Sequence, residues 1–372
     1  MPDTARIQVG KKSELPARWP RFVLSVRENP SARRRAAVLA GAVATGIVLS
    51  VLVLLAAGVP GSDLANEFLV NTLSDPDSLR AVLAQTAPLL LVGAGAALAF
   101  RVNFWNLGLE GQMIWGAIAA TWVALYLAGP SGPLPGAAVL PAMAAAACLG
   151  GMAWAVLPAL LRLRLGINEI VVTLLLNYVA QDFLLQLVYG PWQDPSDSFP
   201  HSAAFPPDAR LPDIGGGIGA ALPFAVLAAL AAWRLVSGTR FGLYMRFVQA
   251  NPTMARAAGL PVRRTMLIAV LLSAAAAGLS GFCIAAGEEG RLTQSFSSGY
   301  GFSGILIAFM ARNSPLAAIP VALAIAWLFV TGQSLQVFYQ IPFAMVQLIQ
   351  AIVVICVAAS EFAVRHRLRW VR

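Results

Sequence analysis

The chain consists mainly of long stretches without a charged residue, separated by short polar or glycine- and proline-rich segments. These runs cover residues 36–62, 81–100, 111–161, 214–233, 265–287, 292–311 and 313–360. A helix that crosses a bilayer needs about 20 consecutive, mainly apolar residues, and the sequence "AGPSGPLPG" divides the longest run. The pattern predicts about ten transmembrane helices, at 36–59, 78–100, 107–128, 135–161, 168–189, 219–236, 265–287, an eighth that ends at about 311, and then 315–331 and 343–362.

Composition supports a membrane protein and excludes a soluble globular one. Hydrophobic residues make up 58% of the 372 residues, and charged residues only 12%, which is too apolar for a polar surface. We therefore expect an all-α, polytopic fold.

The basic residues predict the orientation, because cytoplasmic loops retain Lys and Arg. With both termini in the cytoplasm, 23 of the 26 Lys and Arg residues lie inside, and only Arg80, Arg210 and Arg291 lie outside. Inner arginines held against anionic headgroups explain the net charge of +9. We expect the lipid bilayer, and no nucleic acid, as the partner of this charge.

Three regions are expected along the chain. Residues 1–35 form a basic cytoplasmic segment, residues 36–362 the transmembrane domain, and residues 363–372 a basic cytoplasmic tail. Within the second region we expect an outer loop at 190–218 and a basic cytoplasmic loop at 237–264. The stretch 15–29 is read either as an amphipathic surface piece or as a disordered tail.

Two glycine-rich polar interruptions divide the apolar pattern into similar halves. Each half has a long apolar helix, then an interruption, at 103–111 or at 294–304, and then further helices. Paired interruptions of this kind indicate a transporter with two pseudo-symmetric repeats and irregular backbone beside the path. Two helix hairpins with tight glycine turns are the alternative.

Polar residues inside the predicted helices need a reason, because a charge at the membrane centre costs about 2.5–3.5 kcal/mol on insertion scales. Glu110 lies near a helix start, where it can interact with N-terminal amides and the helix dipole; contact with a solute is the other interpretation. Asn177 and Gln181 share a helix face beside Asp182. That face is expected to meet either other helices or an aqueous path.

The basic loop contains a predicted short helix. Asn251 can cap it, Pro252 suits its first turn, and Gly259 followed by Pro261 ends it. Such a helix suits docking to a cytoplasmic partner, and a connector lying on the membrane surface is the alternative.

The chain carries no energy source of its own. A phosphate-binding loop needs Gly-Lys-Ser/Thr, and Lys11 and Lys12 in "VGKKSE" do not fit. The three cysteines lack pairing or ligand spacing, so no metal site is expected. We also find no nucleophile with a base and no acid pair at workable spacing, so no catalytic residue is predicted.

Four stretches resemble one family. "NFWNLGLEGQMIWGA" at 103–117 resembles a motif of the permease subunits of ATP-binding-cassette importers for nucleosides and simple sugars. "GINEIVVTLLLNYVA" at 166–180 is similar to a stretch of the nucleoside branch. The stretch at 240–260 resembles the coupling segment, and "GYGFSGILIAFMARNSPLA" at 299–317 the glycine motif of the second half. Phe247, Val248 and Gln249 depart from the small residue and glycine that family members commonly have.

This resemblance implies a permease of the bacterial cytoplasmic membrane that moves a nucleoside or simple sugar. It implies as partners a second, non-identical permease, a cytoplasmic ATPase that holds ATP and magnesium, and an extracytoplasmic solute-binding protein. The residues expected along the translocation path are Asn103, Asn106, Glu110, Gln112, Asn177 and Tyr300. Those expected to couple to the ATPase are Asn251, Pro252, Ala255, Arg256, Ala258 and Gly259.

An ion-driven secondary transporter stays open as the alternative at this point. Glu110, Glu169 and Asp182 would be its titrating groups.

Overall fold

The computed structural model describes residues 21–26, 31–61, 72–129, 132–296 and 299–371, and helices dominate it. Contacts divide the chain into two units, residues 1–49 with 353–372 and residues 50–352. Of the predicted surface piece at 15–29, only 21–26 belong to the described residues.

The first unit joins the two ends of the chain. Strand β1 (Arg21–Val26) pairs antiparallel with strand β2 (His366–Val371). The unit also contains most of α1 (Ala32–Ala56) and the end of α14 (Phe343–Arg365). Gly46 lets the two helices approach, because an added Cβ would lie 2.9 Å from Val353 Cα. The sequence pattern did not predict the paired strands.

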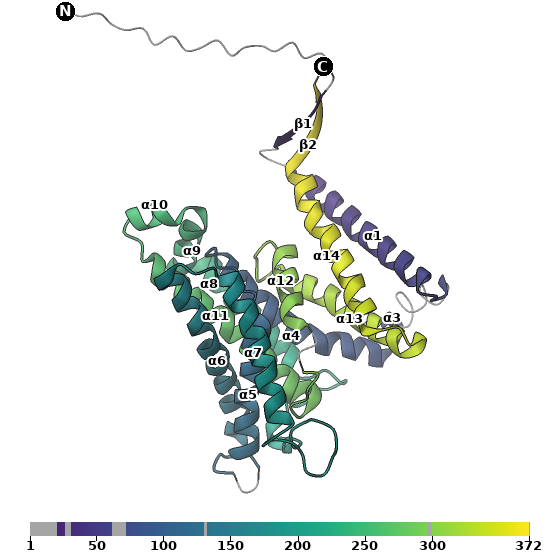
Figure 1. Ribbon diagram of the computed structural model, residues 1–372, viewed down its shortest axis with the longest axis vertical. Helices are drawn as coiled ribbons and strands as arrows, with labels where there is room; N and C mark the ends of the chain where they lie inside the picture. The colour runs from purple at the N-terminus through teal and green to yellow at the C-terminus, as the bar shows by residue number, and fades with distance from the viewer. Residues whose placement is uncertain (1–20, 27–30, 62–71, 130–131, 297–298, 372) are drawn as a thin grey trace, which may run out of the picture. The chain divides into compact units, whose positions relative to one another are not determined.

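The second unit carries the interruptions and the basic loop (Figure 1). Its elements are α3 (Thr72–Ser74), α4 (Pro76–Phe100), α5 (Leu109–Tyr126), α6 (Gly136–Leu160), the π-helical turn η2 (Leu161–Leu165), α7 (Glu169–Val188), the 3-10 turn η3 (Pro207–Ala209), α8 (Ala221–Gly238), α9 (Arg240–Ala250), α10 (Pro252–Ala257), α11 (Val262–Cys283), the π-helical turn η4 (Ile284–Glu289), α12 (Tyr300–Met310) and α13 (Ala318–Tyr339).

Every predicted transmembrane segment contains a helix. Within the described residues, eight helices are long and apolar enough to cross a membrane. The other two are α5, which carries Glu110 and Gln112 in its first residues, and α12, which has only 11 residues. The chain is therefore a multi-pass membrane protein, while the count of ten crossings and the cytoplasmic termini stay predictions.

Helix α4 forms the centre of the second unit. Along its apolar stretch 83% of the residues are buried, whereas in α7 and in α8 only 22% of the corresponding residues are buried. It packs against α8, α11, α12 and α13. The helices α7 and α8 are therefore peripheral and leave most of their surface uncovered by this chain.

Glycines bring α5, α6 and α11 together. An added Cβ on Gly278 of α11 would collide with the Ala147 carbonyl oxygen of α6, and one on Gly151 with the Ala274 carbonyl oxygen. Small residues permit such approach between membrane helices. These three helices therefore form a closely packed support for the segment before α5.

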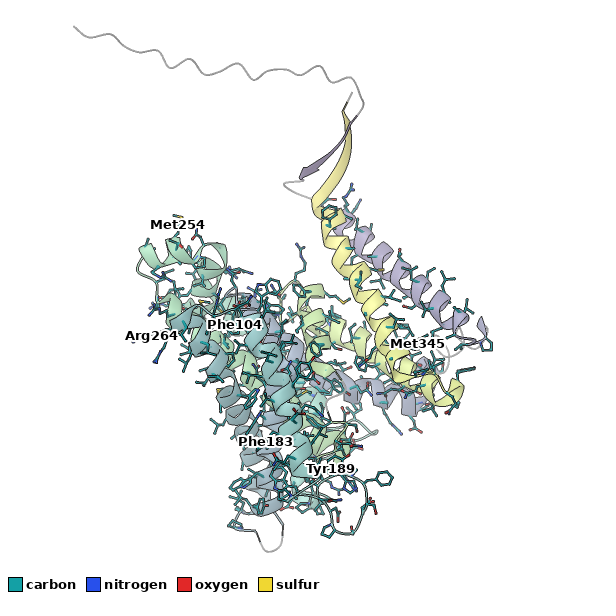
Figure 2. All side chains as sticks on the ribbon, in the orientation of Figure 1. Phe104, Phe183, Tyr189, Met254, Arg264 and Met345 are labelled. Atoms are coloured by element: carbon teal, nitrogen blue, oxygen red, sulfur yellow. The ribbon has the colours of Figure 1, made fainter. Side chains whose placement is uncertain are left out.

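The loops gather at opposite ends of the second unit. Figure 1 shows α9 and α10 at one end, and the turn between α5 and α6 and the loop after α7 at the other. Phe104, labelled in Figure 2, lies near α9, and it belongs to a buried cluster with Met245 and Val248. The first interruption and the basic loop thus share one end.

Candidate functional site

The first interruption runs from 101 to 108, between the end of α4 and the start of α5. Asn103 has φ of 55°, in the left-handed region that Asn tolerates better than most residues. The Phe104 amide returns to the Ala99 carbonyl oxygen at 3.2 Å, which closes the end of α4. A break is therefore present, but the predicted bounds of 103–111 are shifted, because the helix resumes at Leu109 and residues 109–111 belong to α5.

Asn106 and Gln112 form a closed amide pair across this break. Asn106 Nδ2 donates to Gln112 Oε1 at 2.9 Å, and Gln112 Nε2 donates to Asn106 Oδ1 at 3.0 Å. Asn106 Nδ2 also lies 3.3 Å from Ser273 Oγ on α11. Both amides are buried, so their polar groups require these partners. The pair therefore fixes the start of α5 against α11.

Asn177 holds the same segment from α7. Its Nδ2 donates to the Leu107 carbonyl oxygen at 2.8 Å, and its Oδ1 accepts from the Gly111 amide at 2.9 Å. The predicted Asn177 and Gln181 face does turn toward protein, because Gln181 Nε2 donates to the Gln294 carbonyl oxygen at 3.4 Å. Backbone groups freed by the break are thereby satisfied by side chains.

Glu110 links the two interruptions. Its Oε2 accepts from the Gly301 amide at 2.5 Å and its Oε1 from the Gly299 amide at 3.3 Å. Gly299 caps α12, so the carboxylate meets the free amides and the positive dipole end of that helix. The sequence predicted contact with the amides at the start of the helix that carries Glu110, whereas these bonds join it to the start of α12, in the other half of the chain.

Tyr300 lies at the start of α12 and is 5% exposed. Its ring stacks on Phe329 of α13, with centroids 5.6 Å apart. Of the six predicted path residues, only Asn103 is exposed. The role of these residues as path lining stays a prediction, and their visible role is to hold the two interruptions.

The other predicted carboxylates differ in their surroundings. Glu169 is buried, lies 3.1 Å from Arg162 Nε, and accepts from the Trp105 amide at 3.4 Å. Asp182 is exposed on α7. Unlike Glu169, Asp182 forms no ion pair with any of the described residues.

Asn103 connects the first interruption to the basic loop. Its Nδ2 donates to the Gln249 carbonyl oxygen at 3.0 Å and lies 3.4 Å from the Val248 carbonyl oxygen. Both acceptors belong to the last turn of α9. Residues 247–249, where this sequence differs from the pattern of the family that it resembles, therefore include both acceptors of this contact. The side chain of Val248 is fully buried.

The predicted short helix of the basic loop is present as α10. Asn251 Oδ1 accepts from the Thr253 and Met254 amides at 3.0 and 3.1 Å, Pro252 is the first residue, and Gly259 follows with φ of 78°. Figure 2 shows Met254 on the outer side of this helix, and it is 69% exposed.

The two faces of α10 differ. Ala255 is buried against the rest of the second unit, whereas Arg256 is exposed. An open hollow of about 360 Å³ lies beside α10, lined by Arg256, Leu260, Pro261, Val262, Arg263 and Arg264. This end thus offers a basic, partly apolar surface anchored by Ala255.

At the opposite end, the loop after α7 is bound to the segment after α11. The Ser202 amide donates to the Leu292 carbonyl oxygen at 2.8 Å, and the Phe205 amide to the Gly290 carbonyl oxygen at 2.8 Å. His201 Nε2 lies 2.9 Å from Asp197 Oδ2, and Arg291 lies 3.1 Å from the same nitrogen. The sequence pattern did not predict this connection.

We expect the His201 contact to weaken at alkaline pH. The hydrogen bond with Asp197 raises the pKa of His201, and Arg291 opposes this shift. A raised folded-state pKa contributes stability that is present at low pH and lost as the pH rises through it. The apparent Tm should therefore fall between about pH 6 and pH 8, and less so in His201→Gln. Equal pH slopes for the two proteins would contradict this role.

Sequence reasoning missed two partners of the interruptions. Ser273, in the middle of α11, carries no pattern that distinguishes it from other small residues in a membrane helix. Gly301 lies in "SSGYGFSG", where several glycines occur together, and only its contact with Glu110 distinguishes it. Among the described residues, no group of three or more His, Cys, Asp or Glu could hold a metal.

Comparison with known proteins gives matches over most of the chain. Residues 78–358 match the family "Branched-chain amino acid transport system / permease component". The glucose ABC transporter permease protein TsgB13 of Haloferax volcanii is 38% identical over 340 residues, which cover 86% of this chain and 88% of the relative. The guanosine ABC transporter permease protein NupP of Bacillus subtilis is 29% identical over 292 residues, with 76% and 81% covered. The nucleoside ABC transporter permease protein NupB of Lactococcus lactis is 25% identical over 294 residues, with 76% and 79% covered.

Proposed function

The chain belongs to the family of branched-chain amino acid transport system permease components, and from this premise we propose that it forms half of an ATP-driven importer. Its solute would be a simple sugar or a nucleoside, as the names of its relatives suggest. The matched region includes both interruptions and the basic loop. The ion-driven alternative has no support from these relatives, and Glu110 and Glu169 already have fixed partners.

The contact that carries the mechanism is the hydrogen bond from Asn103 to Gln249. It joins the loop that contains the exposed helix α10 to the first interruption. A partner that moves α10 would move the end of α9, and Asn103 would transmit that displacement to the segment before α5. Glu110 would extend it to α12 through the Gly299 and Gly301 amides.

The transporter would cycle between inward- and outward-open states. Only ligands that bind the two states with different affinity can drive such a cycle. Binding of ATP and magnesium to a separate cytoplasmic ATPase would shift the equilibrium between the two states. Docking of a loaded extracytoplasmic binding protein would also shift it. A second, non-identical permease would complete the path in the bacterial cytoplasmic membrane, with α10 as the coupling helix.

This function is tested by purification and uptake. The chain is purified in mild detergent and the associated proteins are identified; we expect an ATPase and a second permease. Uptake of labelled glucose and of labelled uridine is then measured in vesicles. Uptake that stops with vanadate supports the proposal, whereas uptake that stops with a protonophore at constant ATP would indicate ion coupling.

The Asn103 contact gives a separate prediction. Asn103→Gly keeps a residue that accepts φ of 55° but removes the amide donor. A net contribution of about 0.5–1.5 kcal/mol per hydrogen bond corresponds to a change of up to about tenfold. We expect the amount of solute moved per ATP hydrolysed to decrease by up to about tenfold, while the ATPase stays bound.

A matched control is available at the end of α12. Asn313 also has a left-handed backbone, with φ of 57°, but its side-chain Oδ1 has no hydrogen-bond partner in the described residues. Asn313→Gly should leave the ratio of transport to hydrolysis unchanged. If Asn103→Gly behaves like Asn313→Gly, Asn103 does not couple the loop to the interruption.

A further inference from the structure

A polar stripe runs along the uncovered side of α7. Tyr178, Asp182, Gln186 and Tyr189 are all exposed and recur every three or four residues, so they share one helix face. This face differs from the one that carries the buried Asn177. Toward the start of the helix, the next residue on this face is the apolar Leu175, which is 59% exposed.

The stripe lies at membrane depth. Helix α7 has 20 residues and qualifies as a membrane span, so at 1.5 Å per residue it is about 30 Å long, the thickness of the hydrocarbon core. Asp182 comes six residues before the end at Val188, which places it about 9 Å inside that end. A carboxylate at such depth is costly against lipid chains, and these residues usually face a water-filled cavity or protein.

The outer end of the stripe joins the second interruption. Tyr189 Oη donates to Gln294 Oε1 at 2.8 Å, and Gln294 belongs to the segment between α11 and α12. The same segment leads to Gly299 and Gly301, which bind Glu110. The uncovered polar face is therefore continuous with the irregular backbone of the second half.

We infer that this stripe of Tyr178, Asp182 and Gln186 lines a water-filled route and contacts a neutral, polyhydroxylated solute. The inference rests on the proposed function and names the surface that the solute meets. A carboxylate accepts hydrogen bonds from neighbouring hydroxyls, a tyrosine ring packs against a sugar or base, and the Gln186 amide both donates and accepts. The charge of Asp182 disfavours anionic solutes such as phosphorylated sugars.

The test measures water access in the assembled transporter. Asp182→Cys is treated with a membrane-impermeant, negatively charged methanethiosulfonate reagent, which reacts with the thiolate. Leu227→Cys is the matched control, since Leu227 is 65% exposed and lies six residues inside α8 from the same end. Both variants retain Cys148, Cys283 and Cys356, so the native thiols contribute equally.

We expect Asp182→Cys to react at least about tenfold faster than Leu227→Cys, because only a hydrated thiol ionises. Loss of the carboxylate should lower uptake of labelled glucose or uridine in this variant, and modification of the thiol should block the uptake that remains. Equal, slow reaction of the two variants would overturn the inference. Fast reaction in the isolated chain but not in the complex would show that a second subunit covers the stripe, which also overturns it. Fast modification of Asp182→Cys that leaves uptake unchanged would overturn the inference as well.

The outcomes separate the inference from the proposed function. A complex that takes up glucose or uridine with ATP while Asp182→Cys stays unreactive refutes the stripe alone. A complex that takes up neither solute while Asp182→Cys reacts rapidly refutes the proposed solute class, and the labelling still establishes a water-lined face on α7.

Discussion

Gly301→Ala is expected to destabilise the protein strongly, although it adds only one methyl group. An added Cβ would lie 2.5 Å from the Glu110 backbone nitrogen and 2.7 Å from its Cα. Both are backbone atoms of α5, which cannot rotate away, and α5 is held by α6 and α11. Overpacking costs about 1–3 kcal/mol in typical cores, and we expect the upper part of this range. The Glu110 hydrogen bond to the Gly301 amide would also be displaced.

The measurement is the apparent Tm of the purified protein in detergent. Gly41→Ala is the matched control, since Gly41 also lies in a helix and an added Cβ there meets nothing within 4 Å. That change should be neutral or stabilising, because Ala is the better helix former. An unchanged Tm in Gly301→Ala would mean that α12 can move away from α5, and that the contact between the halves is loose.

Replacing residues 252–258 by a Gly/Ser linker of equal length is expected to abolish binding of the ATPase. The replacement removes α10, its Pro252 start and the exposed Met254, while Asn251 remains. A linker of the same length in place of residues 212–218, a stretch that already contains three glycines at the other end of the unit, is the control. It should leave the ATPase bound.

A point variant removes the contact without removing the helix. Met254→Asp changes a side chain that is 69% exposed, so α10 should stay folded. Central apolar residues of an interface typically contribute more than about 1 kcal/mol, and we expect the affinity for the ATPase to fall at least about tenfold. Full co-purification and coupled uptake in the linker variant would refute α10 as the docking helix.

Helix positions were predictable because the apolar runs and glycine or proline boundaries are explicit in the sequence. The predicted cap of α10 is confirmed residue by residue, since Asn251, Pro252 and Gly259 each act through local geometry. Local patterns of this kind depend on neighbours within one turn. They can therefore be read without knowing the rest of the fold.

The partners of the polar residues were not predictable. Asn106 pairs with Gln112 only six residues away, but it also meets Ser273, which is 167 residues distant. The side-chain amides of Asn106 and Gln112 could equally have pointed toward a solute. Likewise, Asn177 and Asp182 lie only five residues apart on α7, yet Asn177 is buried and Asp182 is exposed. Which side of α7 is covered depends on how α5, α6 and the other helices pack.

The contact between Glu110 and Gly301 also constrains the order of biosynthesis, because 191 residues separate the two. At translation rates of about 5–20 residues per second, the carboxylate enters the membrane roughly 10–40 s before the amides that receive it have been made. During this interval the carboxylate lacks the amides that hold it in the folded chain, so water or the insertion machinery must supply its hydrogen bonds. The start of α5 can therefore reach its final position only after the ribosome has completed most of the other half.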